Sequence, residues 1–156
     1  MAFRSHCAGG GQATLSSANA WPKSQALRIL DTDICVAILR GNAEIIERRR
    51  HTLDRVATTW VTAGELFYRA AKSADPMANR RLVGRFLETL PILGLDSISA
   101  QFFGVLRATF EAKGKRLADA DLWIGAIARA HRAAVVTANT RHFDRIEGLR
   151  LENWTT

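Results

Sequence analysis

Acidic residues follow the apolar segments of this sequence at three separate places. They are Asp31 and Asp33 in RILDTDICVAIL, Glu65 in TTWVTAGEL, and Asp119 and Asp121 in LADADLWIGAIA. A carboxylate at the end of a buried strand is costly unless it is hydrogen-bonded, paired with a cation or bound to a metal. Which of these three arrangements applies decides the chemistry that this chain can perform.

Each of these acids also has a possible structural role. The stretch from Thr62 to Glu65 matches a capping box, in which Glu65 would bond back to the Thr62 amide. Asp33 and Asp119 suit helix N-caps. Asp31 is harder to explain in this way, because the run before it is apolar and Asp33 already supplies a cap.

The pair Asp119 and Asp121 divides between two roles. Residues two apart on a helix point to nearly opposite sides, so both acids cannot face one site if both are helical. We assign Asp119 to the cap and Asp121 to the site, although the helix dipole alone would also favour an acid in the first turn. A fourth segment, VVTANTRHF, follows another apolar run and offers Thr137, Asn139 and His142.

Strand-like and helix-like segments alternate along the chain after residue 27. The predicted strands are 27–30, 55–61, 92–95, 133–138 and 149–154, and the predicted helices are 34–39, 42–53, a segment from 62 onward, 78–90, 99–112 and 119–131. This order predicts an α/β fold of three layers, α/β/α, with a mainly parallel sheet of four to five strands. Ligands of such sheets lie beyond the carboxyl ends of the strands, so the acids should meet at one edge.

Several carboxylates at one sheet edge would repel one another strongly in a partly desolvated cleft. A divalent cation among them would relieve this repulsion. Oxygen ligands without a Cys or His cluster suit Mg²⁺ or Mn²⁺. Such ions lower the pKa of water and neutralise a phosphodiester during its cleavage.

The overall charge favours a polyanionic partner. Lys and Arg number 22 against 15 Asp and Glu, which gives a net charge of +7. An acidic, metal-binding pocket on a basic body is the layout expected of a nuclease. The two cysteines, Cys7 and Cys35, are too few for a disulfide framework or a zinc site and fit a reducing cytoplasm.

The first 26 residues differ from the rest of the chain. They are rich in Gly, Ser and Ala and show no sustained period. We interpret residues 1–26 as a flexible extension and residues 27–156 as one domain. No apolar stretch reaches the length of a membrane span, so no membrane association is expected.

Four segments together resemble the successive motifs of the PIN-domain ribonucleases: LDTDICVAIL, VTAGELFYRA, LADADLWIGAIARAH and VVTANTRHFDRIEGLRLENW. They are most similar to the VapC toxins of bacterial toxin–antitoxin systems. The resemblance runs from about Leu27 to Trp154. It implies a PIN-like fold, Mg²⁺- or Mn²⁺-dependent endonucleolytic cleavage of RNA, and inhibition by a cognate VapB-type antitoxin bound over the cleft.

The resemblance also implies the roles of individual residues. Many PIN domains carry a fourth acid where this chain has Asn139, so one metal ion is expected rather than two. Asp33 falls where relatives often carry Asn or Ser, which agrees with capping. The implied site consists of Asp31, Glu65 and Asp121 as catalytic metal ligands, Asn139 as a further catalytic residue, and Thr137 and His142 as substrate-positioning residues.

Two alternatives remain open at this point. The D-x-D motif after an apolar strand also resembles the haloacid-dehalogenase phosphohydrolases. That family places Thr where this chain has Cys35, and its acidic metal motif should follow, not precede, the VVTAN segment. The missing fourth acid also permits a PIN-like module that has lost activity and serves only in a complex.

Two further expectations concern surfaces. The apolar face of RRLVGRFLETL exceeds what a small core needs, which predicts a homodimer. Trp60 and Trp123 could stack on RNA bases, but both lie in predicted core elements, so we expect them to pack in the interior.

Overall fold

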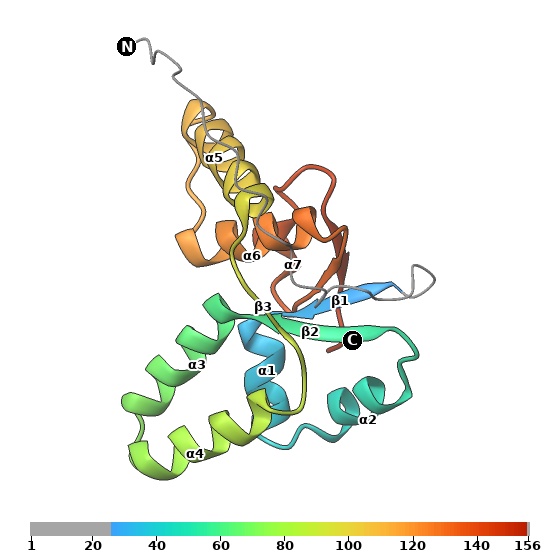
Figure 1. Cartoon of the computed structure of the whole chain (residues 1–156), viewed down its shortest axis with the longest axis vertical. Helices are drawn as coiled ribbons and strands as arrows, with labels where there is room; N and C mark the ends of the chain where they lie inside the picture. Colours follow the sequence, from blue (N-terminus) through green and yellow to red (C-terminus); the bar gives the residue numbers. More distant parts are fainter. Residues whose placement is uncertain (1–25, 156) are drawn as a thin grey trace, which may run out of the picture.

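Five strands and seven helices alternate along residues 26–155, the part of the chain that the computed structural model describes (Figure 1). The strands are β1 (Leu27–Leu30), β2 (Arg55–Thr59), β3 (Ile92–Leu93), β4 (Ala134–Val136) and β5 (Arg150–Glu152). The helices are α1 (Thr32–Leu39), α2 (Ala43–His51), α3 (Trp60–Ala71), α4 (Pro76–Leu87), α5 (Ser97–Ala112), α6 (Asp119–Ala130) and α7 (Thr140–Phe143).

The strands form one parallel sheet in the order β3-β2-β1-β4-β5. The central strand β1 pairs with β2 on one side and β4 on the other, so that Ile29 lies beside both Ala57 and Val135. The predicted α/β class and parallel sheet are therefore confirmed. Because all strands run in one direction, the carboxyl ends of β1, β2 and β4 meet at one edge.

Helices cover both faces of the sheet, which gives the expected three layers (Figure 1). Helices α1 to α4 lie on one face, and α5, α6 and α7 lie on the other. Successive strand residues point to opposite faces, so Leu30 joins the core under α1 to α4 whereas Ile29 joins the core under α5 to α7. Each face thus has its own apolar core.

Three local predictions need correction. The second strand ends at Thr59, because Trp60 already begins α3. Trp60 is 59% exposed and does not pack in the interior, whereas Trp123 stacks on Phe103 with ring centroids 3.7 Å apart. The short helix Thr140–Phe143 was not predicted.

Two expectations concern the first 26 residues and membrane association. Residues 1–25, which make up nearly all of the expected extension and include Cys7, lie outside the described residues. Within residues 26–155, no helix combines the length and apolar character that a membrane crossing requires.

Candidate active site

The carboxyl end of β1 places two acids at the start of α1. Asp31 has extended backbone angles and is the N-cap of α1, where its Oδ1 accepts a hydrogen bond of 2.7 Å from the Thr32 amide. The cap is therefore Asp31, and the expectation that Asp33 supplies it is wrong. Asp31 is only 7% exposed, whereas Asp33 follows in the first turn and is half-buried.

Thr137, directly after β4, connects both acids. Its buried hydroxyl lies 3.0 Å from Asp31 Oδ2 and 3.3 Å from Asp33 Oδ2. The hydroxyl has a single proton, so it donates a hydrogen bond to one of these oxygens at a time. Asp33 Oδ2 also accepts a hydrogen bond of 2.9 Å from the Ala138 amide. Asp33 thus belongs to the site, a role that the sequence analysis missed.

Glu65 reaches this edge from α3. The N-cap of α3 is Thr59, whose hydroxyl accepts a hydrogen bond of 3.1 Å from the Thr62 amide. Glu65 lies more than a turn inside the helix, so the expected capping box with Thr62 is wrong. Instead, Glu65 Oε2 accepts a hydrogen bond from the Thr32 hydroxyl, which joins α3 to the start of α1.

Asp121 approaches from the other side of the sheet, in the first turn of α6. Its side chain is 19% exposed, and its Oδ2 lies 3.1 Å from His142 Nδ1 on α7. Asp119 diverges from it, as expected, and pairs with Arg107 at 3.1 Å with its side chain 64% exposed. Asp119 is not the cap, because the N-cap position is held by Ala118 without a side-chain hydrogen bond.

Asn139 lies in the segment between β4 and α7. It occupies the N-cap position of α7, but its side chain makes no capping hydrogen bond. Its backbone amide donates a hydrogen bond of 3.0 Å to the Thr137 hydroxyl oxygen. The structure therefore brings Asn139 beside the acids and leaves its side chain exposed.

The electrostatics show that the four acids influence one another. Burial, followed by the negative charge of Asp33, raises the pKa of Asp31 to about 7, and the charge of Asp121 adds to this increase. Burial also raises the pKa of Asp121, to which Glu65 and Asp33 contribute, whereas His142 opposes the change. Within residues 26–155, no Lys or Arg is among the main groups that set either pKa.

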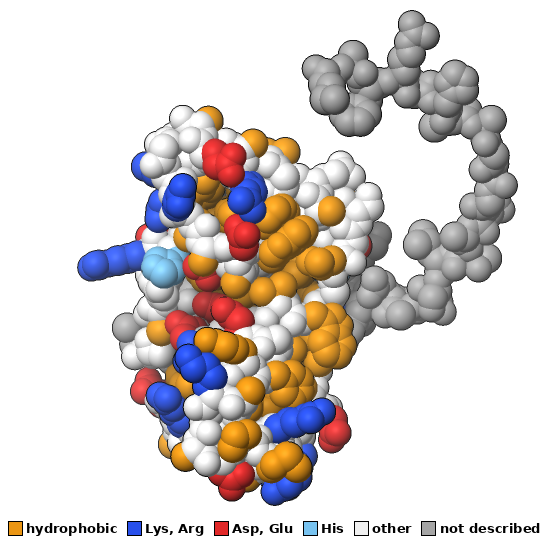
Figure 2. All heavy atoms as spheres, turned by 90° about the vertical axis from the view of Figure 1, so that its left-hand side faces the viewer, with side chains coloured by type: hydrophobic (Ala, Val, Ile, Leu, Met, Phe, Trp, Pro, Cys, Tyr) orange, Lys and Arg blue, Asp and Glu red, His pale blue; other side chains and the backbone are white. Residues whose placement is uncertain are grey.

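These acids lie in the middle of the face that presents the carboxyl ends of the strands. Figure 2 shows acidic side chains gathered there, with Lys and Arg side chains above and below them and apolar side chains to one side. Asp31 and Asp121 thus lie among other carboxylates, and no lysine or arginine is among the main groups that act on their charge within residues 26–155. Bringing a cation into the group would lower the free energy of their ionised forms.

The donor set fits a hydrated Mg²⁺ or Mn²⁺ ion. The available ligands are hard carboxylate oxygens, and Mg²⁺ in proteins keeps several waters while it contacts only one or two carboxylates. In the described part of the chain, no three His, Cys, Asp or Glu side chains form a completed ligand cluster. The arrangement suits an ion held partly through water, since Glu65 and Asp121 are bonded to Thr32 and His142.

The sequence matches the PIN domain family over residues 28–149. The chain belongs to the PIN-domain family. Within it, this PIN domain is a VapC-type ribonuclease toxin of a toxin–antitoxin system. It is 34% identical over 127 residues to Ribonuclease VapC2 of Haemophilus influenzae, covering 81% of the chain and 96% of that relative. It is 33% identical over 128 residues to the tRNA(fMet)-specific endonuclease VapC of Shigella flexneri, covering 81% and 97%.

Solved structures give the same answer for the fold. The PIN domain aligns with the crystal structure of DNA-bound VapBC from Salmonella typhimurium at a TM-score of 0.78 and 33% identity, over 83% of this chain and 99% of that chain. It aligns with VapBC2 from Rickettsia felis, bound to a DNA fragment from its promoter, at a TM-score of 0.77 and 30% identity, over 82% and 98%. The expected family and PIN-like fold are confirmed, and the haloacid-dehalogenase alternative is set aside.

Proposed function

We propose that this PIN domain cleaves RNA endonucleolytically with one Mg²⁺ or Mn²⁺ ion bound at the carboxyl edge of the sheet. The observation that carries the proposal is the gathering of carboxylates at this edge, where Asp31 Oδ2 and Asp33 Oδ2 both lie within 3.3 Å of the Thr137 hydroxyl and burial beside other negative charges raises the pKa of Asp31 to about 7. When bound, the ion supplies an activated water and neutralises charge on the phosphodiester. Family membership supports the nuclease reaction, and the donor set supports the type of ion.

In this proposal the acids bind the ion and their neighbours orient them. Asp31 and Asp121 hold the ion, and Glu65 assists directly or through a bound water. Thr137 fixes the orientation of Asp31 through its hydroxyl. His142 orients Asp121 in the same way from α7.

The remaining polar groups position the substrate. The exposed amide of Asn139 can hold a water or a phosphate oxygen, but it adds no negative charge. Asp33 adds a charge, yet its two oxygens already accept hydrogen bonds from the Ile34 and Ala138 amides. One ion, with Asp33 as a positioning residue, therefore agrees with the donor set better than two ions.

A set of three matched variants tests this proposal. Asp31→Asn and Asp121→Asn keep the size of the side chain but remove its charge, so each should lower RNA cleavage at least about 100-fold. Asp119→Asn is the control, because Asp119 pairs with Arg107 outside the site and should leave cleavage unchanged. Cleavage is measured on a panel of structured RNAs that includes initiator tRNA, in Mg²⁺ and in EDTA.

The outcomes separate the possible explanations. Equal cleavage by the wild type and all three variants would mean that a contaminating nuclease is responsible and that our site assignment is wrong. A wild-type protein that cuts no RNA in Mg²⁺ or Mn²⁺ would instead support the inactive module. Initiator tRNA is included because the Shigella flexneri relative is described as specific for it.

We also infer that a VapB-type antitoxin binds this PIN domain over the acid cluster, which consists of Asp31, Asp33, Glu65 and Asp121. The related crystal structures are VapBC complexes, so a toxin of this type is found with its antitoxin. An antitoxin that covers the carboxyl edge of the sheet would exclude RNA and metal together. The proposed RNA substrates and the buried free thiol of Cys35 fit a reducing cytoplasm.

A further inference from the structure

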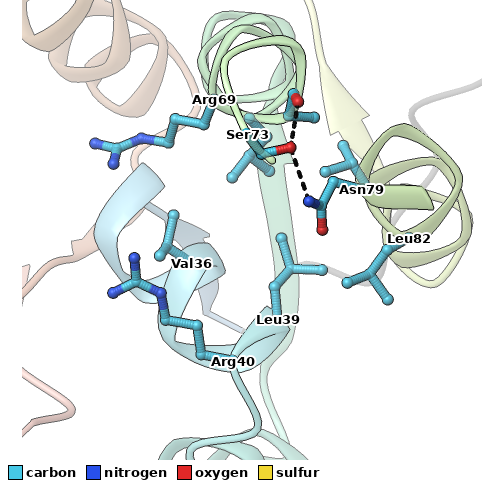
Figure 3. A pocket seen from close by; sticks show the side chains of 10 residues that line it. Val36, Leu39, Arg40, Arg69, Ser73, Asn79 and Leu82 are labelled. Carbon is cyan, nitrogen blue, oxygen red and sulfur yellow. Dashed lines mark hydrogen bonds between the residues drawn. The ribbon is translucent and has the colours of Figure 1, made fainter. Parts of the chain in front are cut away.

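Two arginines border a hollow that Asp33, one of the four acids, also lines. The hollow has a volume of about 590 Å³, and its lining includes Asp33, Arg40 and Arg69. A second hollow of about 280 Å³ shares the two arginines and continues between α1, α3 and α4 (Figure 3). Figure 3 shows that the guanidinium groups of Arg40 and Arg69 extend to the same side, away from Leu82 and Asn79.

The spacing along the helices ties each arginine to an acid of the site. Asp33 and Arg40 are seven residues apart at α1, and Glu65 and Arg69 are four apart on α3. Residues at these spacings share one face of a helix. With a rise of 1.5 Å per residue, each arginine lies about 6 to 10 Å further along its helix than the acid.

In the part of the chain that the structure describes, neither arginine has a neutralising partner. Both are exposed, and neither has a hydrogen bond or ion pair through its side chain among residues 26–155. By contrast, Arg107 is held by Glu111 and Asp119. A guanidinium group offers several hydrogen-bond donors in a planar fork that matches phosphate oxygens. Two unpaired arginines beside a nuclease site can therefore bind a phosphate.

We propose that Arg40 and Arg69 bind the RNA backbone at a phosphate next to the scissile one. The inference rests on the proposed ribonuclease function and adds the direction in which the substrate leaves the acids, along the hollow between α1 and α3. The acid cluster itself repels a polyanion, so RNA affinity must come from cationic groups beside it. Contacts of this kind hold the backbone without reading its sequence.

The test compares two double variants on a 5′-fluorescein-labelled single-stranded RNA of mixed sequence. R40A/R69A removes the proposed phosphate contacts and should raise KM about tenfold while kcat stays within about twofold, because the acids are untouched. The dependence of log KM on log salt concentration should become shallower by about 1.4, or 0.7 for each lost charge. R80A/R81A removes two exposed arginines of α4 that line neither hollow and should change none of these quantities.

A binding measurement keeps this inference separate from the proposed function. The dissociation constant for the same RNA is measured by fluorescence anisotropy in the D121N background, which does not depend on cleavage. Weaker binding after R40A/R69A, but not after R80A/R81A, supports the inference even if the wild type cuts nothing. Unchanged RNA binding overturns it, and so does a variant that loses affinity for the antitoxin alone, since the pair would then serve a protein partner.

Discussion

The ionisation of Asp31 links the site to the stability of the protein. Its ordinary pKa is 3.8, but the folded protein raises the pKa to about 7. Between these values the unfolded chain has released the proton while the folded protein still holds it. The free energy of unfolding should therefore fall as the pH rises from about 4 to 7 and level off above that range, by at most about 4 kcal/mol.

Asp31→Asn should remove this contribution, so the metal-free variant should be more stable than the wild type at pH 8 and close to it at pH 4. Urea unfolding in EDTA at the two pH values measures the difference. Asp121 acts in the same direction, and comparing the variant with the wild type isolates the part due to Asp31. A wild type equally stable at both pH values, or Asp119→Asn with the same effect, would contradict the assignment.

At the residue scale, the sequence was sufficient to predict where the acids lie but not which hydrogen bonds they make. Asp31, Glu65 and Asp121 follow apolar runs, and that pattern placed them at one edge correctly. The role of Asp33 was missed because Asp31 is the N-cap with extended backbone angles. The rule that residues two apart diverge applies only when both are helical, so Asp31 and Asp33 can both reach Thr137.

At the element scale, replacing each of two helical glycines by alanine should change the free energy of unfolding in opposite directions. A Cβ at Gly125 in α6 would lie 2.5 Å from Cδ1 of the buried Ile146, whereas a Cβ at Gly84 in α4 would meet no heavy atom within 4 Å. Gly84→Ala should therefore raise the free energy of unfolding by about 0.5 to 1 kcal/mol.

Gly125→Ala should lower the free energy of unfolding by about 1 to 3 kcal/mol, because Ile146 has little room to move. Urea unfolding of both variants measures this opposition, and each serves as the control for the other. Because α6 also carries Asp121, we expect Gly125→Ala to weaken metal-dependent cleavage as well. Stabilisation of both variants would show that α6 and the segment around Ile146 are packed more loosely than the structure indicates.

The elements themselves were largely predictable, and their ends were not. Hydrophobic periodicity located the long helices, but the change from strand to helix at Thr59 depends on a cap that lies inside the β-branched run. The sequence pattern therefore assigned Trp60 to a strand and to the core. The helix Thr140–Phe143 is too short to show a period, which explains why it was missed.

At the scale of the whole molecule, the expected homodimer can be assigned to a surface. In α4, Val83, Phe86 and Leu87 are buried in the core, and Leu82 is 39% exposed. Figure 2 shows exposed apolar side chains gathered on one side of the face that it presents. The apolar residues that are more than half exposed include Trp60, Tyr68, Leu95, Ile98 and Val105.

These residues belong to adjacent segments. A Cβ at Gly94 would lie 3.7 Å from Trp60 Cδ1, so the start of α3 lies beside the segment that leads into α5. Ile98 and Val105 are seven residues apart on α5 and share one face of that helix. The exposed Trp60 thus lies beside the segment that carries Leu95 and leads to Ile98, and exposed apolar areas of this kind are often covered in protein interfaces.

We therefore predict that the antitoxin-free protein is a homodimer through this surface, with twice the chain mass of 17.2 kDa. Ile98→Asp places a charge in the contact and should give a monomer, because burying an unpaired carboxylate is costly. Leu53→Asp is the control: Leu53 is 90% exposed and precedes the amino end of β2, whereas Trp60 follows its carboxyl end, so this change should leave the dimer intact. Light scattering coupled to size-exclusion chromatography measures the masses, and a monomeric wild type would overturn the prediction.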